Sequence, residues 1–98
     1  MSGTKNQEVT LNVRYDIPDH EWKIVADVYR SMEGWLDADD LPRWFGFEED
    51  PMYIWASVEP GGIQFVAKID PDLWTAWLAN LCSKLSAALG REIHDAEL

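Results

Sequence analysis

Two alternating segments on either side of Pro60-Gly61 constrain the fold of this chain more than any other feature. Apolar and polar residues alternate over 52–59 and again over 63–69, and a period of two is typical of strands with one buried face. If Glu59 pairs with Gly62, the facing pairs on one side are all apolar, namely Val58 with Ile63, Ala56 with Phe65 and Ile54 with Ala67. A slip of one residue would mix the two faces, so a hairpin loop of two or four residues is predicted. Pro-Gly fits a type II turn, whereas short hairpins prefer primed turns, and both loop lengths stay open.

An earlier segment, residues 9–16, alternates in the same way. Val9, Leu11, Val13 and Tyr15 fall on one side and polar residues on the other, which predicts a half-buried strand. Pro18 ends this strand because proline has no N–H group to donate. Residues 1–7 are polar and without a pattern, and they are expected to fray.

A first helix is predicted from about His20 to about Glu33. Asp19 is the expected N-cap, and Gly34 is a suitable C-terminal stop. Apolar residues at spacings of three and four form one stripe, which comprises Trp22, Val25, Tyr29, Met32 and Leu36.

A second and better defined helix follows Asp70. The pattern indicates Asp70 as the N-cap, Pro71 as the first helical residue and Gly90 as the stop. Its apolar stripe is continuous and comprises Trp74, Trp77, Leu78, Leu81, Leu85, Ala88 and Leu89. Residues 91–98 then form either a short edge strand beside the first strand or a loose tail.

The predicted order is strand, helix, strand, strand, helix and, if the tail pairs, a further strand. This order indicates one α+β domain over residues 1–98. We expect a three- or four-stranded antiparallel sheet with two helices on one face, in the ferredoxin-like or split βαβ arrangement.

Charge restricts the class of partner. Eighteen acids against eight bases give a formal net charge of −10. Nucleic acid and anionic membranes both require a basic surface, so neither is an expected partner. The acidity favours either a basic protein partner or solubility alone.

Cys82 is the only cysteine, so no internal disulfide is expected, which fits a reducing compartment. No apolar run approaches the roughly 18 residues of a membrane span. The first residues lack the apolar region of a signal peptide. A cytoplasmic protein is therefore expected.

The acids between 37 and 48 resemble a calcium loop in spacing only. Asp37, Asp39, Asp40 and Glu48 fall near ligand positions. The fifth and sixth positions, which need an oxygen ligand and a glycine, hold Leu41 and Pro42. No calcium site is predicted.

Other chemistry has even less support in the sequence. Cys82, His20 and His94 are the only residues of the types that bind transition metals through nitrogen or sulfur, and nothing in the sequence brings them together. A thiol in apolar surroundings is inert, and Gly61-Gly62 belongs to a turn rather than to a phosphate loop. We predict no catalytic residue, cofactor or metal.

The acidic segment, residues 33–50, carries seven acids, one base and four large rings. It is expected to be irregular, with a short helical turn from Asp39 or Asp40 to Gly46. The rings either fold back over the core as a lid or form a binding surface that the acids surround. The candidate residues in this segment are Trp35, Asp37, Asp39, Asp40, Trp44, Phe47, Glu48, Glu49 and Asp50.

The sheet face without helices offers a second candidate surface. Tyr53, Trp55 and Val66 would be exposed there among polar residues, and an exposed aromatic patch suits either a homodimer or a ligand. Tyr53 and Trp55 therefore join the candidate site.

Three functions compete on this basis. The leading hypothesis is a small non-catalytic protein-binding domain, such as an inhibitor, an immunity-type protein or an adaptor that engages a basic partner. The alternative is a small-molecule binder or enzyme with a pocket at the open sheet face of a dimer. A nucleic-acid mimic ranks third, because the acids fall in caps and loops rather than at phosphate spacing.

Overall fold

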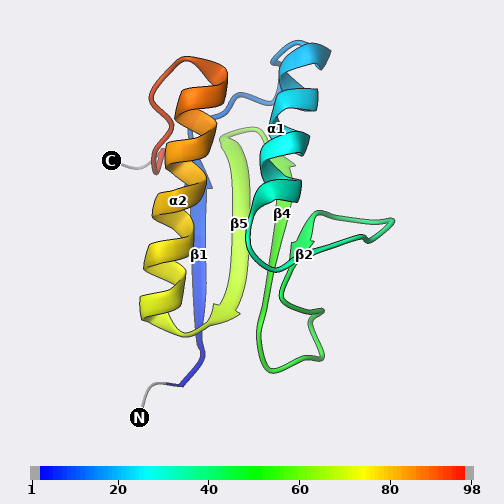
Figure 1. Cartoon of the computed structure of the whole chain (residues 1–98), viewed down its shortest axis with the longest axis vertical. Coiled ribbons are helices and arrows are strands. Elements are labelled where there is room, and N and C mark those ends of the chain that lie inside the picture. Colours follow the sequence, from blue (N-terminus) through cyan, green and yellow to red (C-terminus); the bar gives the residue numbers. More distant parts are fainter. Residues whose placement is uncertain (1–2, 97–98) are drawn as a thin grey trace.

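Two helices cover one face of a five-stranded antiparallel sheet in the computed structural model, which describes residues 3–96 (Figure 1). The strand order is β1-β5-β4-β3-β2. The strands are β1 (Lys5–Leu11), β2 (Trp35–Leu36), β3 (Arg43–Trp44), β4 (Tyr53–Glu59) and β5 (Gly62–Ile69), and the helices are α1 (Asp19–Ser31) and α2 (Pro71–Leu89).

The β4–β5 hairpin has the predicted register with the shorter loop. Glu59 pairs with Gly62, and the three apolar pairs face each other as expected. Gly62 has a φ of 141°, and a Cβ there would collide with the Leu11 carbonyl oxygen. Glycine therefore permits both the turn and the close approach of β1.

Helix α2 also agrees with its prediction. Asp70 accepts hydrogen bonds from the backbone N–H groups of Asp72 and Leu73, Pro71 is the first helical residue, and Gly90 is left-handed with φ 71°. The helix buries Trp74, Trp77, Leu81 and Leu85 against the sheet.

Helix α1 begins differently from the prediction. Asp19 is inside the helix, and Pro18 occupies the N-cap position without a side-chain hydrogen bond. The Pro18 carbonyl instead accepts from the N–H groups of Glu21 and Trp22. The assignment of Asp19 as N-cap was therefore wrong, because the fixed φ of proline already sets the start of the helix.

The first strand lies closer to the N-terminus than predicted. Residues 5–7 belong to β1 and pair with β5, so their predicted fraying is wrong; residues 1 and 2 lie outside the described residues. Val13 is buried as expected but follows the strand, and a Val13 N–H···O Leu11 hydrogen bond turns the chain there. Tyr15 is consequently 59% exposed rather than buried.

The acidic segment contains two short strands, and the second of them, β3, lies where a helical turn was predicted. β2 pairs with β3, and β3 pairs with β4. These additions make the sheet five-stranded rather than three- or four-stranded, and its topology is not clearly ferredoxin-like.

The tail adds a bridge rather than a strand. Leu11 pairs with Asp95, and Asn12 donates its backbone N–H to the carbonyl of His94. The tail therefore lies beside β1 as expected, whereas residues 97 and 98 lie outside the described residues.

A tryptophan-rich aromatic cluster fills the core. The Trp44 ring meets Tyr29 and Trp77 edge-on, each with ring centroids 5.0 Å apart, and Trp35 at 5.7 Å. Trp44 Nε1 donates to the Tyr29 carbonyl at 3.1 Å, and Trp77 Nε1 to the Glu33 carbonyl at 3.0 Å. Both buried indole N–H groups are thus satisfied. Neither described helix is long and apolar enough to cross a membrane.

Candidate functional site

Arg43 organises the acidic segment. It pairs with Trp55 across β3 and β4, so its side chain is on the sheet face that the helices leave open. Its Nε and Nη2 donate to the two oxygens of Asp40 at 3.2 and 2.7 Å, and Nη1 is 2.9 Å from Glu48 Oε1. The guanidinium is also 5.1 Å from the centroid of the Phe47 ring. Only 5% of Arg43 is exposed, so one base holds together two acids and a ring.

These contacts change the acidity of the paired groups. Hydrogen bonds from Arg43 hold the pKa of Asp40 well below its ordinary 3.8. Contact with the same guanidinium lowers the pKa of Glu48 from 4.5. The two carboxylates in turn raise the pKa of Arg43. All three groups are therefore charged at neutral pH.

Acid is expected to weaken this network. Both carboxylates have a lower pKa in the folded protein, so their stabilisation is present above the unfolded values of 3.8 and 4.5 and is lost as the pH falls through the folded ones. Between about pH 6 and about pH 2, the urea midpoint of the wild type should fall further than that of Asp40→Asn. Asp39→Asn is the control, since Asp39 makes no ion pair with a described residue. If the urea midpoints of Asp40→Asn and Asp39→Asn depended on pH in the same way, the expectation would be contradicted.

The other acids of the segment divide into structural and free groups. Asp37 accepts a hydrogen bond from Trp35 Nε1 at 3.1 Å, and Asp50 accepts one from the Phe47 N–H at 2.7 Å. Asp39 and Glu49 remain exposed and pair with no described base. The acidity available to a partner is therefore smaller than the acid count suggests.

The rings of the segment also separate. Trp44 is fully buried and presents no surface to a partner, and Trp35 is half-buried against it. Trp44 and Trp35 therefore fold back onto the core, as expected if the rings of this segment form a lid. Phe47 is on the other side, over Arg43 and 38% exposed. Between the buried Trp44 and the exposed Phe47, the backbone of Phe45 is left-handed with a φ of 69°.

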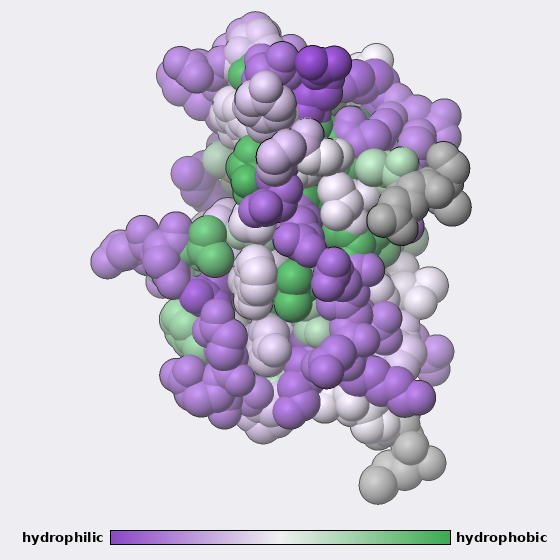
Figure 2. All heavy atoms as spheres, turned by 180° about the vertical axis from the view of Figure 1, so that it is seen from behind, coloured by the Kyte–Doolittle hydropathy of each residue, from purple (hydrophilic) through white to green (hydrophobic). Residues whose placement is uncertain are grey.

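The face of the sheet without helices, here called the open face, joins the acidic segment directly. One row of paired residues crosses all five strands, in the order Leu36, Arg43, Trp55, Val66 and Glu8. Tyr53 and Lys68 form the neighbouring pair. Figure 2 shows this side of the molecule as pale and apolar side chains bordered by hydrophilic ones. The acidic segment and the open face, which the sequence suggested as separate candidate surfaces, are therefore continuous, and they join at Arg43.

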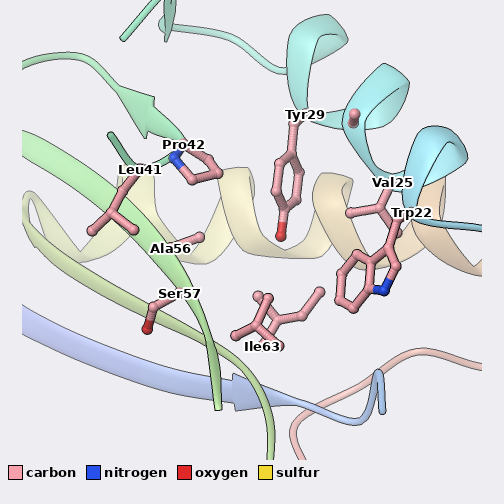
Figure 3. Close-up of a pocket in the computed structure, with 10 residues that line it drawn as sticks. Trp22, Val25, Tyr29, Leu41, Pro42, Ala56, Ser57 and Ile63 are labelled. Carbon is pink, nitrogen blue, oxygen red and sulfur yellow. The ribbon is translucent and has the colours of Figure 1, made fainter. Parts of the chain in front are cut away.

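A pocket on the opposite, helix-covered side was not predicted from the sequence. It lies between α1, residues 41–42 and the hairpin, and it has a volume of about 240 Å³ (Figure 3). Trp22 and Tyr29 line it from α1, although the apolar stripe assigned both to the core. The sequence contains one indication of this pocket. Tyr29 stands in a stripe of apolar residues, although its hydroxyl group needs a hydrogen-bond partner.

Cys82 and His94 come together at a third place, contrary to expectation. Both line a shallow hollow beside α2 together with Asp95. Burial and the charge of Asp95 raise the pKa of the Cys82 thiol, which disfavours the nucleophilic thiolate. His94 Nδ1 is 2.8 Å from the Asp95 carbonyl oxygen. Within residues 3–96, no three His, Cys, Asp or Glu side chains are grouped as metal ligands.

No protein-family model matches this chain, and no curated protein or solved structure matches it either.

Proposed function

We propose that this protein is a small non-catalytic binding module that engages a basic protein partner through the open face and the attached acidic segment. The Arg43 network carries the proposal. It holds the Phe47 ring over Arg43, the cross-strand neighbour of Trp55, and the carboxylates of Asp39 and Glu49 stay exposed in the attached acidic segment. An inhibitor, an immunity-type protein or an adaptor would all use such a surface.

The chemistry of the surface suits a basic partner. Tryptophan is enriched among residues that dominate binding energy, and Trp55 is half-buried in the middle of the open face. Acids around the aromatic centre would accelerate association with a positively charged partner and disfavour acidic competitors. Binding should consequently weaken as salt is added.

Replacing Trp55 with alanine is expected to weaken partner binding by about tenfold or more, since a central aromatic residue contributes at least ~1–2 kcal/mol. Tagged wild-type protein would be incubated with native lysate at low and high salt, and captured proteins would be quantified by mass spectrometry. Tyr15→Ala is a matched control, because Tyr15 is an exposed aromatic residue beside the hairpin turn.

Equal capture by Trp55→Ala and wild type would contradict the proposal. So would the absence of any salt-sensitive partner, if Asp39, Glu48 and Glu49 can also be replaced without a phenotype. Stable folding of each variant would be checked first by thermal unfolding.

A homodimer through the open face is the second candidate. A hollow formed by β1 together with Tyr53 and Val66 favours a homodimer, since side chains of a second copy could fill this hollow. An enzyme in such a dimer has weaker support, because His20 is in α1 and His94 in the tail, away from this face. Light scattering at micromolar concentration separates monomer from dimer.

We also infer that β1, α1, β4, β5 and α2 form a ferredoxin-like unit to which β2 and β3 are added. The order β1-β5-β4 and the tail bridge at Leu11 support this relation.

A further inference from the structure

The pocket beneath α1 has the size of a small organic molecule. Its walls come from the helix, from Leu41 and Pro42, and from the hairpin, where Ala56 and Ile63 lie (Figure 3). An apolar cavity of about 150 Å³ accommodates benzene, and pockets for drug-sized ligands begin near ~300 Å³. A volume of about 240 Å³ is therefore suited to a molecule with one ring and a few further atoms.

Tyr29 supplies a polar group inside this apolar space. The residue is only 6% exposed, and no hydrogen bond joins its hydroxyl to another described residue. Figure 3 shows the hydroxyl directed into the pocket, between Ala56, Ile63 and Trp22. The hydroxyl oxygen is not itself enclosed, because it keeps a small accessible surface at the pocket wall. A purely apolar ligand would cover it and leave it without a partner, which is unfavourable, so a ligand that hydrogen-bonds to it would bind more tightly.

The hydroxyl is held in place by the core. The Tyr29 ring meets Trp44 edge-on at 5.0 Å and Phe65 at 5.9 Å. Its backbone carbonyl accepts from Trp44 Nε1. A fixed polar group loses little conformational freedom when it binds a ligand, which favours binding and fixes the ligand's orientation.

The surroundings favour a neutral ligand. No Lys, Arg, His, Asp or Glu side chain lines the pocket, so a charged ligand would lose its hydration without gaining a partner. Desolvation raises the pKa of Tyr29 above its ordinary 10.0, so its hydroxyl stays protonated and can donate. The net charge of −10 further disfavours anions.

We infer that this pocket binds a neutral one-ring organic molecule whose single hydroxyl or carbonyl group hydrogen-bonds to Tyr29. The site is separate from the open face, and the inference does not depend on the proposed protein partner.

A matched pair of probes tests the inference. p-Cresol and toluene differ by one hydroxyl, and each would be titrated into ¹⁵N-labelled protein while backbone and indole N–H resonances are recorded. Saturable shifts are expected at Trp22, Ala26 and Val58, which line the pocket. p-Cresol should bind about five- to tenfold more tightly than toluene, as expected for one net hydrogen bond.

Two variants assign the effect to the pocket. Tyr29→Phe keeps the ring and should remove the preference for p-cresol while toluene binding is retained. Ala26→Leu fills the pocket from α1 with a good helix former and should abolish binding of both probes. Ala79→Leu, at an exposed position of α2, is its control and should bind like wild type. Dispersed spectra of each variant verify the fold.

Four results would overturn the inference. The first three are the absence of saturable shifts up to the solubility limit of p-cresol, unchanged shifts in Ala26→Leu, and an undiminished p-cresol preference in Tyr29→Phe. Shifts at the same residues that follow protein concentration rather than probe would instead identify a second copy as occupant and would also overturn it. Trp55→Ala should bind p-cresol like wild type, so failure here and failure of the proposed partner site remain distinguishable.

Discussion

Replacing Trp44 with alanine is expected to lower the free energy of unfolding by about 3–5 kcal/mol, the usual range for truncating a large buried ring. Trp44 has no exposed surface and contacts four other rings, of Tyr29, Trp35, Phe65 and Trp77. The substitution leaves a cavity at their centre and also removes one of the two hydrogen bonds that the Tyr29 carbonyl accepts, since only the bond from the Met32 N–H remains. Since small domains are stable by only ~5–15 kcal/mol, a large part of the population should unfold at modest urea concentration.

Urea denaturation followed by far-UV circular dichroism measures this loss. Trp44→Phe retains most of the ring volume and should be clearly less destabilised. Trp55→Ala removes an indole from the open face and should have the smallest effect of the three. A loss below about 1 kcal/mol for Trp44→Ala, the level of an average substitution, would mean that Trp44 is not at the centre of the core.

Replacing Arg43 with methionine is expected to lower the free energy of unfolding by about 2–3 kcal/mol. Removing one partner of a fully buried ion pair costs ~3–5 kcal/mol, but Asp40 and Glu48 are about half exposed and keep part of their hydration, so the loss is smaller. The two acids would then repel each other without a cation between them. Methionine retains a long apolar side chain, so lost packing contributes little.

The effect of Arg43→Met should be local as well as global. Hydrogen exchange should accelerate for the backbone of β2, β3 and residues 46–50, and remain slow in β5 and α2. Arg43→Lys restores the charge but not the two-oxygen contact with Asp40, so an intermediate stability is expected. Combining Arg43→Met with Asp40→Asn should cost less than the sum of the single changes. Strict additivity would show that the pair at 2.7 Å contributes nothing.

The hairpin and α2 were predictable because their signals are redundant. Three apolar pairs around Pro60-Gly61 fit one register and no neighbouring one. Asp70, Pro71 and Gly90 mark both ends of α2 independently of its apolar stripe. Several residues specify each of these elements, so an ambiguous signal at one residue does not change the predicted bounds.

β1 and the two short strands could not be located in this way. Residues 5–7 enter β1 through backbone hydrogen bonds to β5, which leave no apolar pattern in the sequence. β2 and β3 contain two residues each, too few for any period to be detected. Tertiary contacts place them, in particular the burial of Trp44 and the pairing of β3 with β4.

The candidate site was predictable in composition but not in arrangement. The sequence identified Arg43 as the only base of the acidic segment, but not that it would be covered and paired twice. Nor does an apolar helical stripe distinguish a ring that fills the core from one that lines a pocket, as Trp22 and Tyr29 do. Such distinctions depend on the space between elements that are distant in sequence.

The strand order has a consequence for polymerisation. An unpaired strand edge can recruit further strands and begin a fibril, and β1 and β2 are the two edges of this sheet. β2 is only two residues long, and the tail covers the end of β1 at Leu11. Lys5 shares a face with Val9 and Leu11, and an added strand would have to bury its charge. Both edges therefore resist templated growth, and any association between copies is left to faces of the molecule rather than to its edges.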